Sequence, residues 1–248
     1  MKKITLLLVA ALFSSAVFAQ YLTLKEILDG YYKVNNVEKM KEVNTVIVKG
    51  SSTNMGQTFP FTIYKKRPDK FRLEVPIQGT SMLQIYNGDK GWIVTPWTSN
   101  PLKEMTAKQL TGFKKETDFE GPLYNWKQKG NKVVLMSKEK MGDTDVYQLK
   151  LTSKDSSVTY YYIDAKKFVL LKTKSVKNIK GQHVETEKLF SNYRKEVDFL
   201  FAHSIKVISN GHVNQTMEIT SVKYNAPVDD KLFNKPKVPE TPGVYNGK

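Results

Sequence analysis

The sequence predicts a mainly β protein with some helix, built on a large antiparallel sheet of about 11–12 strands. Short runs in which apolar and polar residues alternate recur along the chain. In the clearest run, Phe71–Ile77, the apolar side chains point one way while Arg72 and Glu74 point the other. Turn residues separate these runs, and Asn210-Gly211 is the strongest hairpin signal. A sheet of this size must curl or close, so its concave face needs a filling.

The predicted strands form two groups, each strand bounded by turn residues. They are Thr45–Lys49, Gln57–Tyr64, Phe71–Ile77, Met82–Tyr86 and Trp92–Val94, and then Lys132–Ser137, Asp145–Leu151, Val158–Ile163, Phe168–Ser175, His183–Phe190, Leu200–Ser209 and His212–Tyr224. Pro60 indicates an edge strand or a bulge. Ser99-Asn100-Pro101 is expected to break the sheet, and Ile179-Lys180-Gly181 to form a turn. A last helical turn at Asp229–Phe233 should dock Phe233.

Helices are the available filling for the concave face. Thr23–Glu26 matches a capping box, and Leu24, Ile27 and Leu28 lie at helical spacing in a stretch that ends at Asn35-Asn36. We therefore predict an amphipathic helix here, which needs an apolar surface to lie on.

A long insertion separates the two groups of strands. It carries little alternation, and we predict two short helices in it, around Thr106–Lys114 and Asp118–Gln128. The first of these contains Leu110 and Phe113. Insertions of this kind are often lids or binding loops.

The first 19 residues are predicted to be a signal peptide and not part of the fold. Lys2 and Lys3 give a positive start, Ile4–Phe13 is apolar, and a cut is expected between Ala19 and Gln20. A membrane anchor is the alternative, but the apolar run is short for a span. The mature chain should then be exported as one domain over residues 20–234, followed by a Pro-rich, extended tail at residues 235–248.

Composition narrows the classes of partner and chemistry. Without Lys2 and Lys3, 37 basic side chains face 24 acidic ones, a formal charge of +13. Export and the scattered lysines argue against nucleic acid; anionic membrane surfaces, acidic partners or a generally basic surface remain open. The chain has no cysteine, which excludes disulfides, a thiolate nucleophile and Cys-ligated metal.

No catalytic or metal-binding pattern stands out in the sequence. It has no glycine-rich phosphate loop and no Gly-x-Ser-x-Gly elbow. A two-residue turn at Asn210-Gly211 places Ser209 opposite His212 and His203 opposite Glu218, which leaves the two histidines roughly 20 Å apart at ~3.3 Å per residue. We therefore expect no enzyme, no catalytic residue, no metal and no cofactor. The interior is either a cavity for an apolar ligand or a filled core.

One motif resembles a known family. Arg67-Pro68-x-x-Phe71 is followed by Leu83-x-Ile85-x-Asn87-Gly88-x-x-x-Trp92-x-x-x-Pro96, which resembles the periplasmic lipoprotein carrier LolA and its relatives with a LolA-like or LolB-like fold. The order of elements agrees, as does the ending from Asp229 to Pro236. The resemblance implies an unclosed antiparallel β-barrel whose apolar concave cavity is covered by helices.

The resemblance also implies a function. Carriers of this kind take acylated proteins from the inner membrane and pass them to an outer-membrane receptor. We accordingly expect a periplasmic, monomeric carrier of lipoproteins or lipids, whose partners are an inner-membrane release complex and an outer-membrane acceptor. An envelope-stress sensor and a free-lipid carrier are the alternatives on the same scaffold.

The expected site residues fall into three groups. By resemblance, Arg67 holds a helical lid shut through hydrogen bonds, and Phe71 lies near the cavity mouth and serves cargo transfer. The alternatives are a solvated turn arginine and a core residue. The other candidates are apolar, either as cavity wall or as helix residues that cargo displaces: Leu73, Val75, Leu83 and Ile85 for the wall, and Leu24, Ile27, Leu28, Leu110 and Phe113 for the helices.

Overall fold

The computed structural model describes residues 22–179 and 182–237. The predicted signal peptide, the turn residues Lys180-Gly181 and all but the first three residues of the predicted tail lie outside the described residues. Within the described part of the chain, no helix has the length and apolar character needed to cross a membrane.

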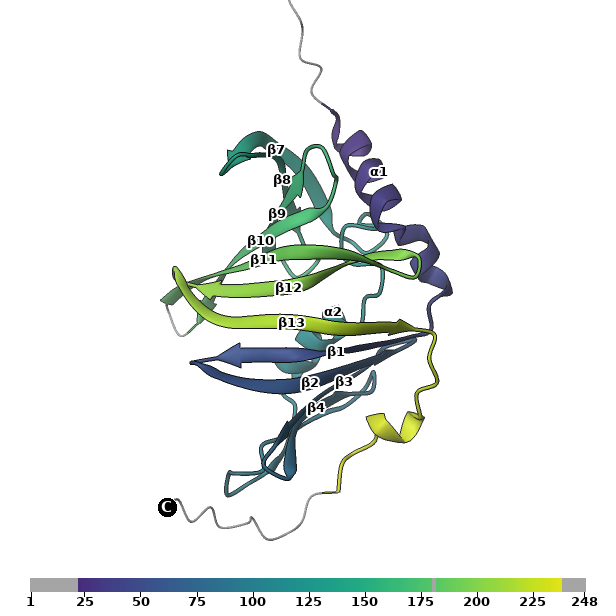
Figure 1. Ribbon diagram of the computed structural model, residues 1–248, viewed down its shortest axis with the longest axis vertical. Helices are drawn as coiled ribbons and strands as arrows, with labels where there is room; N and C mark the ends of the chain where they lie inside the picture. Colours follow the sequence, from purple (N-terminus) through teal and green to yellow (C-terminus); the bar gives the residue numbers. More distant parts are fainter. Residues whose placement is uncertain (1–21, 180–181, 238–248) are drawn as a thin grey trace, which may run out of the picture.

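The strands of residues 22–179 and 182–237 form one antiparallel sheet of 13 strands, which confirms the predicted mainly β class. Across the sheet the order is β6-β5-β4-β3-β2-β1-β13-β12-β11-β10-β9-β8-β7. The strands are β1 (Thr45–Asn54), β2 (Gln57–Lys66), β3 (Lys70–Ile77), β4 (Thr80–Tyr86), β5 (Gly91–Val94), β6 (Leu102–Glu104), β7 (Lys132–Met141), β8 (Thr144–Thr152), β9 (Val158–Asp164), β10 (Leu170–Ile179), β11 (Gln182–Glu196), β12 (Phe199–Ser209) and β13 (His212–Tyr224). Strands β6 and β7 are the two edges, so the sheet is unclosed. Strand directions rotate steadily from one edge to the other (Figure 1).

In the described ranges, four helical elements accompany the sheet. They are α1 (Leu24–Asn35), the 3₁₀ helix η1 (Val37–Glu42), α2 (Ala107–Glu116) and the 3₁₀ helix η2 (Asp230–Phe233). Helix α1 begins at the predicted capping box, in which Thr23 and Glu26 bond reciprocally, and it ends at Asn36 in the left-handed conformation. The last turn, η2, docks Phe233 as predicted, because that ring is fully buried.

Two local predictions in the region of the insertion are wrong. The sheet does not stop at Ser99-Asn100-Pro101, because the chain returns as β6 and pairs Leu102 with Val94. Asp118–Gln128 is a series of turns, since Gly121 and Asn125 have φ of 77° and 48°, values that a right-handed helix cannot accommodate.

Pro60 lies in an internal strand, yet its surroundings resemble those of an edge. Strand β2 pairs with β1 along its whole length, but β3 pairs only with the second half, Thr62–Lys66. Pro60 therefore needs no ladder partner on the β3 side, where its missing N–H costs nothing.

The two faces of the sheet are distinguished by register, because directly paired residues share a face. One row joins Val46, Lys65, Phe71 and Tyr86 across four neighbouring strands. Continued pairing from β13 to β8 carries the same face round to Leu149. We call it the inner face because both α-helices pack on it, α1 near Leu149 and α2 against Phe71. The other face is the outer face.

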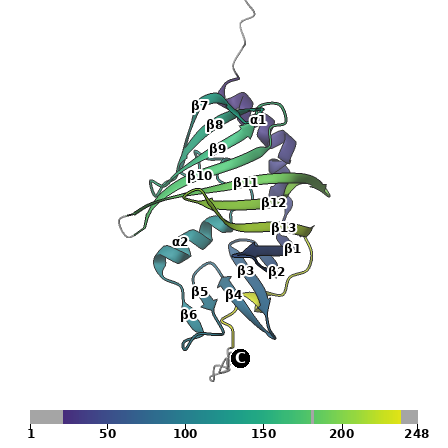
Figure 2. The same ribbon diagram turned by 60° about the vertical axis from the view of Figure 1, so that its left-hand side comes forward.

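The chain between the two edges also crosses the inner face. Residues 105–131 lead from β6 at one edge to β7 at the other and contain α2 (Figure 2). Leu123 from this crossing packs with Ile27 and Leu28 of α1 in one buried cluster over β7–β9. The predicted insertion is thus a cover over the inner face, although only its first half is helical.

Candidate functional site

A strip of half-buried apolar side chains lies on the inner face over β2, β3, β12 and β13. These side chains are Ile63, Leu73, Val75, Phe201 and Met217, and we call them the apolar strip. They rest on a fully buried layer that includes Val48 and Phe61. Their partial exposure means that this part of the inner face keeps apolar area in contact with solvent. Such a surface can take an apolar ligand.

Helix α2 lies beside this strip but is only lightly attached. None of its residues is fully buried, and only Leu110 and Phe113 are half-buried. The Phe113 ring has its centroid 5.3 Å from that of Phe71, and at the end of the helix the exposed Lys115 forms an ion pair with Asp155 at 2.8 Å. A single aromatic contact of this kind is worth about 0.5–1.5 kcal/mol beyond its area burial. Few contacts therefore hold α2 on the inner face.

Arg67 connects the elements that cover the inner face. Its Nε donates to the Val43 carbonyl at 2.7 Å, and Nη2 donates to the Met40 carbonyl at 3.0 Å, at the C-terminal end of η1. Nη2 also forms an ion pair with Glu120 at 2.6 Å, and the guanidinium carbon lies 4.4 Å from the centre of the Phe119 ring. One side chain thus ties η1 to the crossing segment just after α2.

The predicted site residues divide between the faces. Phe71, Leu73 and Val75 lie on the inner face, and Phe71 is buried beneath Phe113. Leu83 and Ile85 do not join them. They pack on the outer face with Trp92, Val228 and Phe233, under the C-terminal segment that ends in η2.

The register of β3 and β4 explains this division. The two-residue turn at Gln78-Gly79 pairs Ile77 with Thr80, so Leu83 lies opposite Glu74. Odd-numbered residues of β3 therefore share a face with even-numbered residues of β4. The sequence indicated a turn at Gln78-Gly79-Thr80, and a turn of three residues would have placed Leu83 opposite Val75 on the inner face. The structure has a turn of two residues, which moves Leu83 and Ile85 to the outer face.

The residues of α1 are also placed differently from expectation. Ile27 and Leu28 are 0% and 5% exposed and belong to the core over β7–β9, away from the apolar strip. Leu24 is half-buried at the edge of the same cluster. Displacing this helix would open a core cluster, so α1 is a fixed cover.

Sequence reasoning did not assign Lys65, a charged residue of the inner face. Lys65 lies in the row between Val46 and Phe71, both of them buried. Burial lowers the pKa of the Lys65 ammonium, while the charges of Glu116 and Asp118 act in the opposite direction. The alternation of β2 indicated this orientation, because Ile63 two residues earlier is apolar.

His203 is a second polar side chain on the inner face. Its ring is 1% exposed, and Nδ1 lies 2.9 Å from the Ile219 carbonyl, which can only accept. Glu196 Oε1 lies 2.8 Å from Nε2 without hydrogen-bond alignment. His203 does not face Glu218 as predicted, because a bulge between Val207 and Ile208 shifts the register by one residue. Among the described residues no cluster of three or more acidic or histidine side chains is placed to hold a metal ion.

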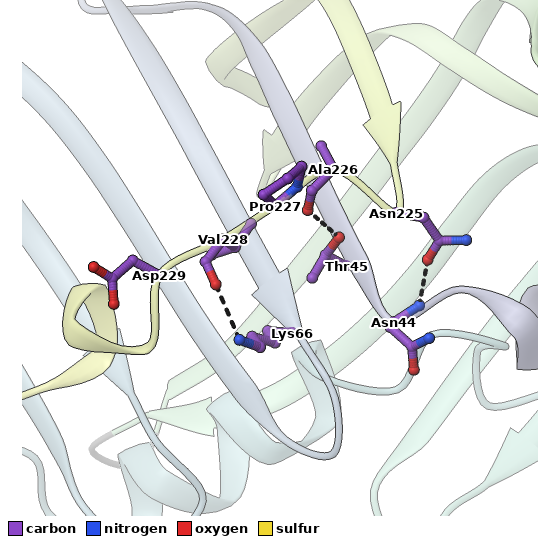
Figure 3. Close-up of a pocket in the computed structure, with 8 residues that line it drawn as sticks. All are labelled: Asn44, Thr45, Lys66, Asn225, Ala226, Pro227, Val228 and Asp229. Carbon is purple, nitrogen blue, oxygen red and sulfur yellow. Dashed lines mark hydrogen bonds between the residues drawn. The ribbon is translucent and has the colours of Figure 1, made fainter.

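An open pocket of about 690 Å³ lies where the C-terminal segment crosses the ends of β1 and β2 (Figure 3). Its polar groups bond to one another. Thr45 Oγ1 donates to the Ala226 carbonyl at 2.6 Å, and Lys66 Nζ donates to the Val228 carbonyl at 2.9 Å. These bonds hold the C-terminal segment against the sheet.

Comparisons with known proteins agree with this architecture. A family model described as "uncharacterized protein" matches residues 70–239. No curated protein matches the chain significantly.

Three solved structures share the fold over most of both chains. A LolA superfamily protein from Nitrosomonas europaea is 16% identical, with a TM-score of 0.56, over 87% of this chain and 99% of that one. A structure from Vibrio parahaemolyticus, described as an outer membrane lipoprotein-sorting protein domain, is 15% identical, with a TM-score of 0.58, over 85% and 95%. A DUF1329 family protein from Desulfovibrio piger is 16% identical, with a TM-score of 0.57, over 84% and 97%. The chain therefore belongs to the family of the matching model, and its fold is that of the LolA superfamily, as the sequence motif predicted.

Proposed function

We propose that this protein is a periplasmic carrier that binds the acyl chains of lipoproteins on its inner face and shuttles them towards the outer membrane. The observation that carries the proposal is the apolar strip, which leaves half-buried apolar side chains beside a lightly packed helix. Acyl chains would cover the strip and remove its apolar area from water. The proposed site has no catalytic role.

Binding has to remain reversible in a carrier. Burial of an acyl chain contributes about 0.8 kcal/mol per CH₂ group, so several long chains would exceed the affinities that proteins reach, about −18 to −21 kcal/mol. Contacts of the empty protein must therefore offset part of this gain. The contacts of Leu110 and Phe113 with the inner face and the bonds of Arg67 would supply a small part of this offset, because cargo would have to break them.

The proposed location and partners follow from the predicted signal peptide and from the description of the Vibrio structure. Export would bring the chain to the periplasm, where an inner-membrane release complex would load it and an outer-membrane acceptor would unload it. A free-lipid carrier on the same scaffold would use the same strip. An envelope-stress sensor would contact a membrane partner without moving cargo.

The test is native mass spectrometry of the exported protein, followed by identification of the material that organic solvent extracts from it. Acylated peptides support the lipoprotein carrier, and free lipid supports the lipid shuttle. An empty protein that also fails to bind a fluorescent acyl probe contradicts both.

A matched pair of variants locates the binding site. Val75→Gln places an amide in the apolar strip, whereas Val134→Gln makes the same change at an exposed outer-face position of β7. The first should weaken binding of the acyl probe about tenfold or more, given the cost of burying an unpaired amide. The second should leave it unchanged. Equal effects would place the site elsewhere.

A further inference from the structure

Lys65 lies on the inner face at the end of the apolar strip. Strand β2 alternates, so Ile63 and Lys65 point inward while Lys66 points outward. At ~3.3 Å per residue, the side chains of Ile63 and Lys65 leave the strand about 7 Å apart. The neighbours of Lys65 in the row are Val46 and Phe71, both buried and apolar.

The Lys65 ammonium has no counter-ion in contact within the described part of the chain, in contrast to its neighbour. Lys66 Nζ donates to the Val228 carbonyl at 2.9 Å and lies 3.2 Å from Asp230. Glu116 and Asp118 lie close enough to raise the pKa of Lys65 but form no ion pair with it. Lys188 of β11 acts in the opposite direction, because its positive charge repels that of Lys65.

Lys65 is half-buried, and it lies between two buried apolar side chains without an ion-pair partner. Partial desolvation of an unpaired charge is unfavourable, so packing alone does not explain a lysine here. An apolar residue such as methionine would suit this row of the sheet better. The position instead offers a compact positive group beside the surface on which acyl chains are proposed to lie. A lysine of this kind is a common ligand for phosphate.

We propose that Lys65 binds the phosphate of an anionic phospholipid whose acyl chains lie along the apolar strip. This inference rests on the proposed function, because it requires acyl chains on the inner face, and it names a phospholipid as the cargo of the free-lipid alternative. In a phospholipid the phosphate is joined to the acyl chains through glycerol, so one molecule reaches both the strip and the ammonium. Glu116, the last residue of α2, and Asp118, which is itself paired with Lys129 at 2.7 Å, act on Lys65 only weakly from a distance in the empty protein. The lipid phosphate would give Lys65 a direct partner when α2 moves away.

The test compares two lipids with identical acyl chains, phosphatidylglycerol and diacylglycerol, by titration against purified protein. The wild type should bind phosphatidylglycerol about tenfold more tightly, the value expected for one hydrogen bond to a charged group. Lys65→Met should lose this preference while diacylglycerol binding persists. Lys65→Arg should retain it, because the charge remains.

Lys49→Met is the matched control, since it removes one positive charge from an exposed position on the outer face of β1. It should keep the preference for phosphatidylglycerol. Equal binding of the two lipids by the wild type, or an unchanged preference in Lys65→Met, overturns the role of Lys65 and leaves the proposed function standing.

Two further outcomes distinguish a phospholipid site from a protein that binds no lipid and from a site for free phosphate. If neither lipid binds the wild type, the proposed function fails together with this inference. Glycerol phosphate alone should not compete at the concentration of the lipid. Competition by it would indicate a site for free phosphate and would overturn the assignment to a phospholipid.

Discussion

The helices α1 and α2 begin in the same way but cover the inner face differently. Each starts with a threonine whose side chain bonds three residues on, to Glu26 in α1 and to Gln109 in α2, in a capping box. Yet α1 inserts Ile27 and Leu28 into a buried cluster, whereas α2 buries no residue completely. Local sequence thus specified both helices, and packing gave them separate roles.

This difference refines the proposed mechanism. The sequence suggested that cargo would displace side chains of both helices. The core position of Ile27 and Leu28 instead makes α1 part of the scaffold, and Leu110 and Phe113 remain as the side chains that cargo would displace. Accordingly α2 is the proposed lid, with Arg67 as the bond that limits its movement.

The largest expected effect comes from truncating the buried face of α1. Ile27→Ala should lower the free energy of unfolding by about 2–5 kcal/mol, because it leaves a cavity in a closed core. Leu110→Ala in α2 should cost less than about 1 kcal/mol, since that side chain is only half-buried. Denaturant unfolding of both variants measures the contrast, and equal losses would remove the distinction between the helices.

The next effect concerns Arg67. Arg67→Leu leaves Glu120 and the Met40 and Val43 carbonyls without their donor, so it should lower stability by about 1.5–3 kcal/mol and speed release of a bound acyl probe. Stopped-flow release from a preloaded sample measures the second quantity.

Arg72 provides the control for this variant. It lies on the outer face and bonds to Glu74 and to the Leu232 carbonyl. Arg72→Leu should also destabilise the protein but leave the release rate of the probe unchanged. If both variants release the probe faster, the effect of Arg67→Leu on release comes from the lower stability of the whole fold and not from the contacts of Arg67.

A pair of glycines tests helix packing with the same substitution. At Gly30 of α1 an added Cβ would lie 2.6 Å from the Phe168 ring, whereas at Gly112 of α2 it would meet nothing within 4 Å. Gly30→Ala should therefore destabilise the protein by about 1–2 kcal/mol through overpacking. Gly112→Ala should stabilise it by about 0.5–1 kcal/mol through helix propensity. Thermal unfolding measures both changes: the midpoint temperature should fall for Gly30→Ala and rise for Gly112→Ala. A higher midpoint for Gly30→Ala would mean that α1 is not tightly packed on the sheet.

The smallest effect is a dependence of stability on pH. Because burial lowers the pKa of Lys65 below its ordinary value of 10.5, the unfolded chain holds this proton more tightly than the folded one. The stability deficit of the wild type relative to Lys65→Met is then fully present at pH values below the lowered pKa. It fades as pH rises towards 10.5. Parallel denaturant titrations from neutral to alkaline pH measure it, and a constant difference would mean that Lys65 is not buried as a charge.

Much of the fold followed from local patterns, because strands, turns and helix caps are set by neighbouring residues. The alternation of Phe71–Ile77 and the capping box at Thr23 both led to the correct element. The turns at Asp118–Gln128 were missed, since the apolar residues there mimic helical spacing although Gly121 and Asn125 adopt left-handed angles.

The candidate site was less accessible from sequence because it depends on contacts between distant segments. Leu83 and Ile85 looked like wall residues until register and the C-terminal segment assigned them to the outer face. Phe201 and Met217 join the apolar strip only because β13 pairs with β1, which no local pattern indicates.

The most direct test of the account is hydrogen exchange followed by mass spectrometry, with and without a saturating diacyl lipid. The account predicts faster exchange over α2, slower exchange over β2 and β3 beside the apolar strip, and no change over α1. Protection or exposure of α1 equal to that of α2, or no change at the strip, would contradict it.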